Sequence, residues 1–349
     1  MKKLKLNKTS RENFLTYAFV IAAFILLQIW SGAGMKSSLK GMLVPICAYV
    51  VMAISLNLTV GVLGELSLGH AGFMSVGAFT GVTAAISLQN VIASAPLRLA
   101  IAMLIGAFFA AIIGFLIGIP VLRLNGDYLA IVTLAFGEII KTIINNLYVG
   151  LDSAGFHMSL LEDKTNLAEG GKLIIAGPMG IGGIQKIASF SGGFILIMLC
   201  LIVIFNLVNS RAGRAIMALR DNRIAAESVG IPVTRYKMMA FVTSAAMAGA
   251  AGALFALNYS TIVANKFDFN TSILILVFVV LGGLGNMFGS IVAAAALTIL
   301  PEMLRGLDKY RMLIYAVVLI LVMLGTNNAR LRALFDKLIP RRKAEKEES

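Results

Sequence analysis

Two ionisable side chains, Glu65 and His70, stand between long uncharged stretches of the chain. They belong to the motif Gly64–Phe73, which reads GELSLGHAGF. An ionisable residue at membrane depth usually serves a function, such as exchanging a proton or binding a polar solute. Two plainer interpretations stay open: Glu65 could lie at the membrane interface, and His70 could be a hydrogen-bonded packing residue. The sequence shows no ladder of Asp and Glu that resembles a proton relay, which argues against an ion-coupled pump.

A second polar interruption lies in the middle of the apolar stretch 270–301, where the chain reads Gly282-Gly283-Leu284-Gly285-Asn286. Three glycines and an asparagine at that depth predict a broken helix or a hairpin. Elsewhere Glu138 and Lys141 are three residues apart, so one helix face would carry both, and we expect them to pair.

Residue types for bond-breaking chemistry are scarce. Cys47 and Cys200 lie in apolar stretches and only His70 and His157 could join them, so no disulfide framework or zinc site is expected. The glycines near 283 lack the third glycine of a dinucleotide fingerprint, and those near 170 lack the spacing of a phosphate-binding loop. We therefore expect no metal, no cofactor and no catalytic residue, and the chain is not expected to be an enzyme.

The elements that position these residues are membrane helices. The 349 residues are 59% hydrophobic and only 13% charged, about half the charge of an ordinary soluble domain. Uncharged stretches long enough for a helix of about 20 residues recur along the chain. They are 13–35, 41–64, 66–97, 99–122, 187–210, 238–265, 270–301 and 312–329. The expected fold is an all-α, polytopic transmembrane helical bundle.

Basic residues orient the bundle, because loops rich in Lys and Arg stay in the cytoplasm. They concentrate in the first eleven residues, in 210–237 and after Arg330, whereas 150–192 holds three Lys against four acids. Residues 14–326 are then one transmembrane domain between a cytoplasmic basic N-terminus, 1–13, and a cytoplasmic basic tail, 327–349. It has an external loop at 150–192 and about ten crossings. The expected spans are 14–30, 42–62, 67–88, 99–121, 128–149, 193–209, 238–257, two passes in the broken segment 271–304, and 312–326. Net charge +13 fits this topology and anionic lipid, and no nucleic-acid module is visible.

The cytoplasmic stretch 210–237 has helical potential at 212–219 and 224–229 and stops at Gly230-Ile231-Pro232. A short helix held under the membrane between two spans suits docking into a cleft of another protein. Without further information it could also be an ordinary basic loop.

The residues ALRDNRIAAESVG at 218–230 resemble the EAA-type loop of ABC importer permeases. More specifically, the chain is similar to the branched-chain amino-acid permease family of the LivM type. Four other segments agree, in the order of that family: GELSLGHAGFMSVG at 64–77, LRLNGDYLAIVTLAFGE at 122–138, GPMGI at 177–181 and VLGGLGNMFG at 280–289. One departure is Ile224, which occupies the position of the glutamate that gives the loop its name.

The resemblance implies one membrane subunit of a binding-protein-dependent importer in the bacterial cytoplasmic (inner) membrane. The implied partners are a second, LivH-like permease, two cytoplasmic ABC ATPases, an external solute-binding protein, periplasmic or lipid-anchored, and membrane lipid. It places Arg214, Asp221, Ala225, Ala226, Glu227 and Gly230 in an ATPase-coupling loop, with Ala226 packed tightly against the partner. It also suggests a translocation path near Ser67, Gly69, His70, Gly283, Gly285 and Asn286.

The substrate implied is leucine, isoleucine or valine. Two alternatives stay open. The first is a permease of the same family for urea, short amides or other amino acids, because scaffold motifs hardly separate these substrates. The second is an ion-coupled secondary transporter that works alone, which would keep its uptake when ATPases are absent.

Overall fold

The structure is a computed structural model that describes residues 8–32, 34, 37–124, 126–152, 155–160 and 172–304, with isolated positions between 310 and 320. The chain divides into two units, Met1–Ala295 and Ala296–Ser349, and each is considered by itself. The predicted span 312–326 lies mostly outside the described residues, as do the tail 327–349 and the first seven residues. The central part of the predicted external loop, 161–171, is also outside them.

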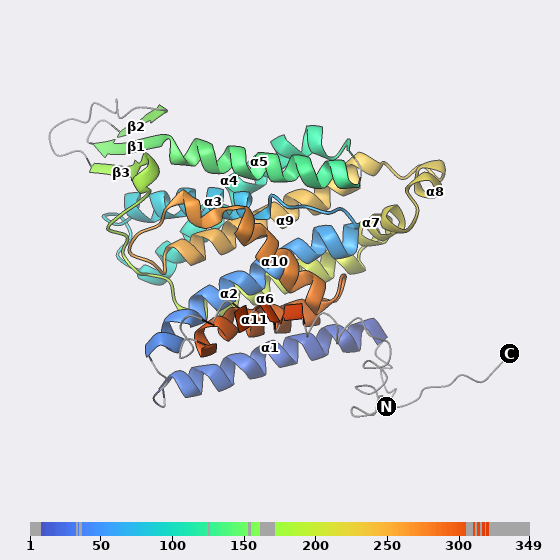
Figure 1. Cartoon of the computed structure of the whole chain (residues 1–349), viewed down its shortest axis with the longest axis horizontal. Coiled ribbons are helices and arrows are strands. Elements are labelled where there is room, and N and C mark those ends of the chain that lie inside the picture. Colours follow the sequence, from blue (N-terminus) through green and yellow to red (C-terminus); the bar gives the residue numbers. More distant parts are fainter. Residues whose placement is uncertain are drawn as a thin grey trace. The chain divides into compact units, whose positions relative to one another are not determined.

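The described part of the chain is mostly helical, as expected (Figure 1). Its helices are α1 (Lys8–Gly32), α2 (Ser37–Asn57), α3 (His70–Ser87), α4 (Ala95–Val121), α5 (Asp127–Asn145), α6 (Phe190–Asn209), α7 (Arg211–Asp221), α8 (Arg223–Ser228), α9 (Val233–Ala256), α10 (Phe269–Gly282) and α11 (Met287–Met303). Short turns of other helix types are η1 (Leu58–Leu63), η2 (Gly177–Met179) and η3 (Ala264–Phe267).

Six segments of the described residues are long and apolar enough to cross a membrane. They are Asn13–Gly32, Ser37–Leu63, Ala95–Val121, Phe190–Asn209, Val233–Ala256 and Ala264–Gly282. The expected spans 67–88 and 128–149 correspond to α3 and α5, which are not among the six. Glycines, hydroxyls and His70 make α3 less apolar, and α5 carries Asp127, Glu138 and Lys141. The ten crossings and the cytoplasmic termini stay predictions.

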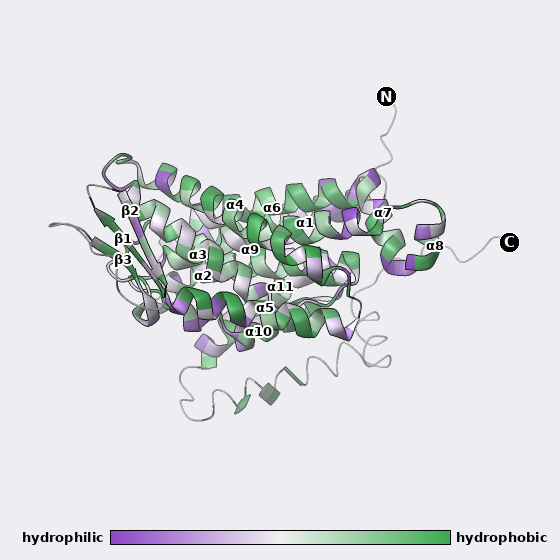
Figure 2. Cartoon of the chain, turned by 90° about the horizontal axis from the view of Figure 1, so that it is seen from above, coloured by the Kyte–Doolittle hydropathy of each residue, from purple (hydrophilic) through white to green (hydrophobic). Residues whose placement is uncertain are grey.

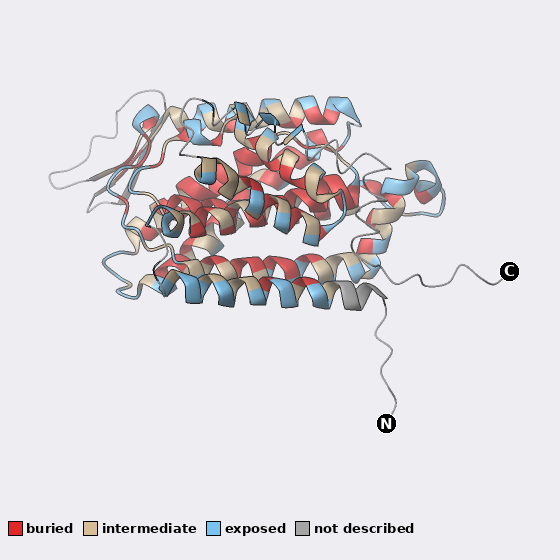
Figure 3. Ribbon diagram, turned by 60° about the horizontal axis from the view of Figure 1, so that its bottom comes forward, coloured by how far each residue is buried: buried red, intermediate tan, exposed pale blue. Residues whose placement is uncertain are grey.

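The core of the first unit forms where α3, α4 and α9 approach one another through small residues (Figure 3). A methyl group added to Gly77 would collide with the Gly249 backbone, and one added to Gly249 with Ala110 and the Gly106 carbonyl. Membrane helices pack in this way because small residues let backbones come close. Gly77 and Gly249 therefore allow these helices to pack backbone against backbone.

A three-stranded antiparallel sheet corrects the all-α expectation. The strands β1 (Leu147–Asp152), β2 (Gly155–Leu160) and β3 (Lys172–Ala176) follow the order β2-β1-β3. The predicted span 128–149 ends earlier than expected, because α5 stops at Asn145 and the chain becomes extended from Leu147. Within the first unit this sheet and the α7–α8 region lie at opposite ends of the helices (Figure 1).

The helices are interrupted at two places. After α2, the turn η1 is a π-helix that ends at Gly64 with φ of +81°, and residues 65–69 then run without helix to the start of α3 at His70. The predicted span from 67 therefore begins three residues too early. Between α10 and α11, Gly283 and Gly285 have φ of +94° and +81°, values that glycine adopts without a steric penalty. The predicted break in 271–304 is confirmed.

Candidate functional site

His70 lies in a polar contact between helices. Its side chain is 2% exposed, and its Nε2 lies 2.7 Å from the Ser55 hydroxyl on α2. The first turn of α3 is held in addition by the Ala71 N–H, which donates to the Ser272 hydroxyl of α10 at 3.1 Å. The interpretation of His70 as a hydrogen-bonded packing residue describes these contacts. Its place on a translocation path stays a prediction.

The segment before His70 crosses close to α5. Gly69 packs so tightly on the Thr133 carbonyl that a side chain would not fit. The Leu68 N–H donates to the Thr133 hydroxyl at 3.0 Å, so this non-helical backbone is partly satisfied by a side chain. Ser67 is 3% exposed and its hydroxyl has no hydrogen-bond partner in the described part of the chain. A buried orphan hydroxyl is costly, which makes Ser67 a candidate contact for a polar solute.

Glu65 forms an ion pair with Lys237. The sequence singled out Glu65 as a candidate but did not indicate Lys237 as its partner. Lys237 is only 3% exposed on α9. The signal was present in the sequence, because both residues stand at the end of an uncharged stretch and could have been placed at the same level of the membrane. The predicted pair between Glu138 and Lys141 is confirmed.

The break between α10 and α11 is attached to the end of α2. Asn57 is fully buried, and its Oδ1 accepts a hydrogen bond from the Gly285 N–H at 2.8 Å. Its Nδ2 donates to the Ser290 hydroxyl at 2.8 Å. Asn286, directly before α11, accepts from the Gly289 N–H in the first turn of that helix at 3.2 Å. Asn57 escaped the sequence analysis although it is the one amide side chain in the stretch 41–64.

Both predicted groups of path residues therefore contact the same element. Ser55 of α2 holds His70, and Asn57, two residues later, holds Gly285. The structure connects the groups through α2 rather than by direct contact between Ser67, Gly69 or His70 and the turn at Gly283–Asn286. Among the described residues no group of three or more His, Cys, Asp and Glu could hold a metal ion.

The stretch 210–237 forms two short helices, as predicted. Ser210 caps α7 by accepting from the Gly213 N–H at 3.1 Å, and Asn222 caps α8 by accepting from the Ala225 N–H at 3.0 Å. Gly230 follows α8 with φ of +82°. Arg214 donates weakly to the Asn209 carbonyl at 3.4 Å. Figure 2 shows hydrophilic residues on these two helices beside the more apolar long helices.

Ala226 is 4% exposed and packs in a small cluster with Leu219 and Val233. Its contacts within this chain are thus with its own loop, and the tight contact with a partner that the resemblance implies stays a prediction. The contacts with its own loop form because the chain folds back after Gly230, where the Ile231 N–H donates to the Ala226 carbonyl at 3.1 Å.

Two exposed apolar side chains at α8 were not among the residues expected in the coupling loop. Ile224, near the start of α8, is 80% exposed, and Val229, directly after α8, is 75% exposed. Ala225, Glu227, Asp221, Arg214 and Gly230 are exposed as well. Glu227 lies 3.9 Å from Arg223, and Asp221 pairs with Arg220 at 3.0 Å. An exposed apolar pair flanked by charges is suited to a protein contact.

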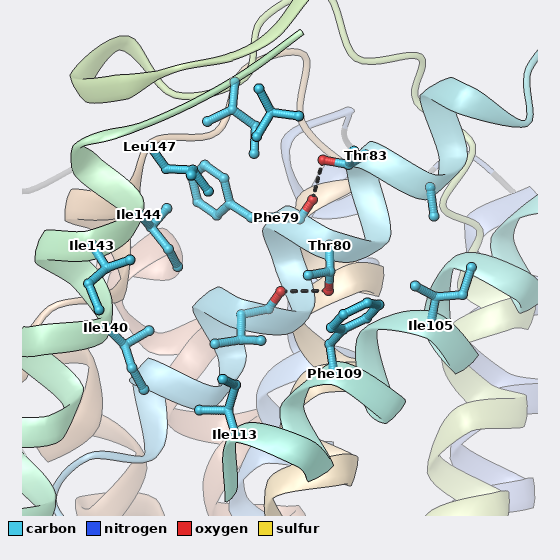
Figure 4. Close-up of a pocket in the computed structure, with 14 residues that line it drawn as sticks. Phe79, Thr80, Thr83, Ile105, Phe109, Ile113, Ile140, Ile143, Ile144 and Leu147 are labelled. Atoms are coloured by element: carbon cyan, nitrogen blue, oxygen red, sulfur yellow. Dashed lines mark hydrogen bonds between the residues drawn. The ribbon is translucent and has the colours of Figure 1, made fainter. Parts of the chain in front are cut away.

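An apolar crevice of about 470 Å³ lies between α3, α4, α5 and the strands (Figure 4). Its two polar lining residues do not offer free groups, because Thr80 donates to the Val76 carbonyl at 2.7 Å and Thr83 to the Phe79 carbonyl at 2.8 Å. The remaining walls include Phe109, Ile140 and Ile143. A zwitterion would be desolvated there without compensation, so the crevice is not an amino-acid site.

Comparison with known proteins decides the family. The sequence model described as "Branched-chain amino acid transport system / permease component" matches residues 38–323. The chain belongs to this permease family. The match includes the non-helical segment 64–69, the helices α7 and α8 and the break between α10 and α11.

Individual relatives agree with the family. The high-affinity branched-chain amino acid transport system permease protein LivM of Salmonella typhimurium is 36% identical over 286 residues, as is LivM of Escherichia coli strain K12. The aligned region covers 79% of this chain and 66% of each relative, so the chain spans just under two thirds of their length. The fructose import permease protein FruG of Bifidobacterium longum is 26% identical over 240 residues, which cover 66% of both chains. No solved structure matches the chain.

Proposed function

We propose that this chain is a membrane subunit of an ATP-driven importer of branched-chain amino acids, in the bacterial cytoplasmic membrane. The observation that carries the proposal is the permease-family match over residues 38–323, together with two capped helices that expose apolar side chains between spans. The chain forms half of the translocation path. ATP hydrolysis belongs to partner subunits, so the chain is not itself an enzyme.

The proposed assembly contains a second, LivH-like permease, two cytoplasmic ATPases and an external solute-binding protein. Helix α8 enters a cleft of one ATPase with Ile224 and Val229, which are the most exposed apolar residues of the loop. Arg214, Asp221 and Glu227 surround this contact, and Gly230 returns the chain towards α9. Closure of the ATPases moves the loop, and the membrane helices change between outward- and inward-facing arrangements.

The proposed path passes the two interruptions of the helices. Ser67 offers an unpaired hydroxyl, and the glycine turn at Gly283–Asn286 exposes backbone. Gly69 and His70 shape this region through packing. These groups bind a zwitterion weakly and do not trap it, because their described contacts involve no ion pair and no Asp, Glu, Lys or Arg is among them. Urea, short amides or other amino acids remain the alternative substrates, and the name of FruG extends this range to a sugar.

Uptake of labelled leucine, valine, urea and fructose in a strain deleted for this chain tests the substrate. Loss of leucine and valine uptake, restored by the gene on a plasmid, is the expected result. If only urea or fructose uptake is lost, the substrate assignment is contradicted while the importer assignment stands. If the plasmid-restored leucine uptake survives deletion of the ATPases and collapses when an uncoupler is added, the alternative of an ion-coupled secondary transporter is supported.

A further inference from the structure

Two basic side chains of the stretch 210–237 reach the segment that joins α2 to α3. From the end of α7, Arg220 donates through its Nη1 to the Gly61 carbonyl at 3.1 Å. From the start of α9, Lys237 forms the ion pair with Glu65. The stretch 210–237 is thus attached at two points, the end of α7 and the first turns of α9, to residues 61–65, which lie more than 150 positions earlier in the sequence.

The backbone between α2 and α3 has an unusual conformation where these contacts are made. Residues 58–63 are a π-helix, a wider turn that is rare and frequently marks a functional site. Gly64 leaves room for the arginine, because a Cβ there would lie 2.5 Å from the Arg220 Cγ. The guanidinium is oriented from its other side by Asp221, whose Oδ1 accepts from Nε at 3.1 Å and from Nη2 at 3.0 Å. Both bonds go to the same carboxylate oxygen, so the charge of Asp221 holds the guanidinium from the side away from Gly61.

The opposite side of the π-helix contacts the break between α10 and α11. A side chain on Gly61 would collide with the Gly285 backbone and with the Asn57 Oδ1. The same Oδ1 accepts the Gly285 N–H. Gly61 therefore touches Arg220 through its carbonyl and the glycine turn through its Cα, so a displacement on one side is transmitted to the other by direct contact.

We infer that Arg220 is a positioning residue, which passes the movement of the ATPase-coupling loop through Gly61 to the Gly283–Asn286 turn. This inference rests on the proposed function, because it assumes that ATPases move α7 and α8. Arg220 touches neither substrate nor nucleotide in this scheme. The ion pair between Lys237 and Glu65 fixes the residues next to Gly61, so that a displacement of Arg220 moves Gly61 instead of only the segment around it.

Reconstituted complexes test the role of Arg220. In liposomes that contain this chain, its permease partner, both ATPases and the binding protein, leucine uptake and ATP hydrolysis are measured together. Arg220→Ala should keep the ATPases bound and hydrolysing, while leucine transported per ATP falls by about tenfold. Arg235→Ala is the matched control, because Arg235 is an exposed arginine of the same stretch and its removal changes the loop charge equally. It should transport as the wild type does.

A thiol at the turn tests the movement itself. Leu284 is 57% exposed between the two glycines, whereas both native cysteines are buried, so Leu284→Cys gives one accessible thiol in the described part of the chain. The rate of maleimide labelling should differ between the nucleotide-free complex and the complex trapped with ATP and vanadate. With Arg220→Ala added, that difference should disappear although hydrolysis continues.

The outcomes separate the inference from the function on which it rests. If the wild-type complex does not bind ATPases, the proposed function fails. If it transports normally but the Leu284→Cys thiol labels equally in both states, or if Arg220→Ala keeps both the nucleotide effect and the transport ratio, only the inference is overturned. Arg220→Lys retains a positively charged hydrogen-bond donor and should restore part of the ratio, which a mere loss of folding would not allow.

Discussion

At the scale of single residues, the structure shows which side chains of the proposed coupling loop are buried and which are exposed. Ala226 is buried in the loop's own cluster with Leu219 and Val233, and the exposed apolar residues are Ile224 and Val229. A buried alanine maintains the shape of the loop, whereas the exposed pair is available to a partner. The sequence contained all five residues but no signal for which of them faces outward, because α8 is too short for a reliable periodicity.

Ala226→Asp should disrupt the loop from within. An unpaired carboxylate in this cluster raises the free energy of the folded loop by about 2–4 kcal/mol. We expect a helix of only six residues to unfold under that cost. The variant should reach the membrane in normal amounts but lose leucine uptake and release the ATPases during purification. The control is Thr234→Asp, which adds the same charge at an exposed position nearby. Normal co-purification of ATPases with Ala226→Asp would contradict the packing role.

Gly230 provides a second test, which distinguishes strain of the backbone from collision of an added side chain. Its φ is +82°, and no atom lies within 4 Å of a Cβ built there. Gly230→Val should therefore cost about 1–3 kcal/mol through backbone strain alone and reduce uptake. Gly230→Asn should be nearly normal, since asparagine tolerates this conformation. Equal uptake by the two variants, measured at equal membrane levels, would show that the positive φ has no role.

At the scale of elements, the sequence predicted interruptions correctly where glycines cluster but missed how they are joined. The break at 283–286 follows from three glycines and an asparagine in an apolar stretch. The π-helix at 58–63 has no such signal in LTVGVL, and its contacts are with Arg220 and Gly285 from distant parts of the chain. The strands β1–β3 were missed because the composition of a membrane protein favours helices as the first hypothesis.

Replacing a glycine of the break tests its role in transport. Gly285→Leu forces a leucine into φ of +81° and pushes a side chain against the Gly61 region. Uptake should be lost, while the ATPases remain bound because α7 and α8 are untouched. Leu284→Ala, at the exposed position beside it, should transport normally. Full uptake by Gly285→Leu would mean that the break is a structural connection without a role in the path.

At the scale of the whole molecule, topology is the open prediction. Within the first unit the sheet and the α7–α8 region lie at opposite ends of the helices (Figure 1). This arrangement agrees with the prediction that the loop 150–192 is external and the stretch 210–237 is cytoplasmic. Reporter proteins fused at positions 220 and 345 should both read cytoplasmic, and one at 165 external. An external reading at 345 would contradict the ten-crossing arrangement and return 271–304 to a single bent span.

The measurement that tests the central claim most directly is ATP dependence of transport in a defined system. Liposomes containing the purified complex, with binding protein and labelled leucine outside, are loaded with ATP, with a non-hydrolysable analogue or with no nucleotide. The account predicts leucine accumulation only with ATP, unchanged when a proton ionophore removes any ion gradient. Accumulation without ATP that collapses with the ionophore would contradict it, because the chain would then work as an ion-coupled transporter.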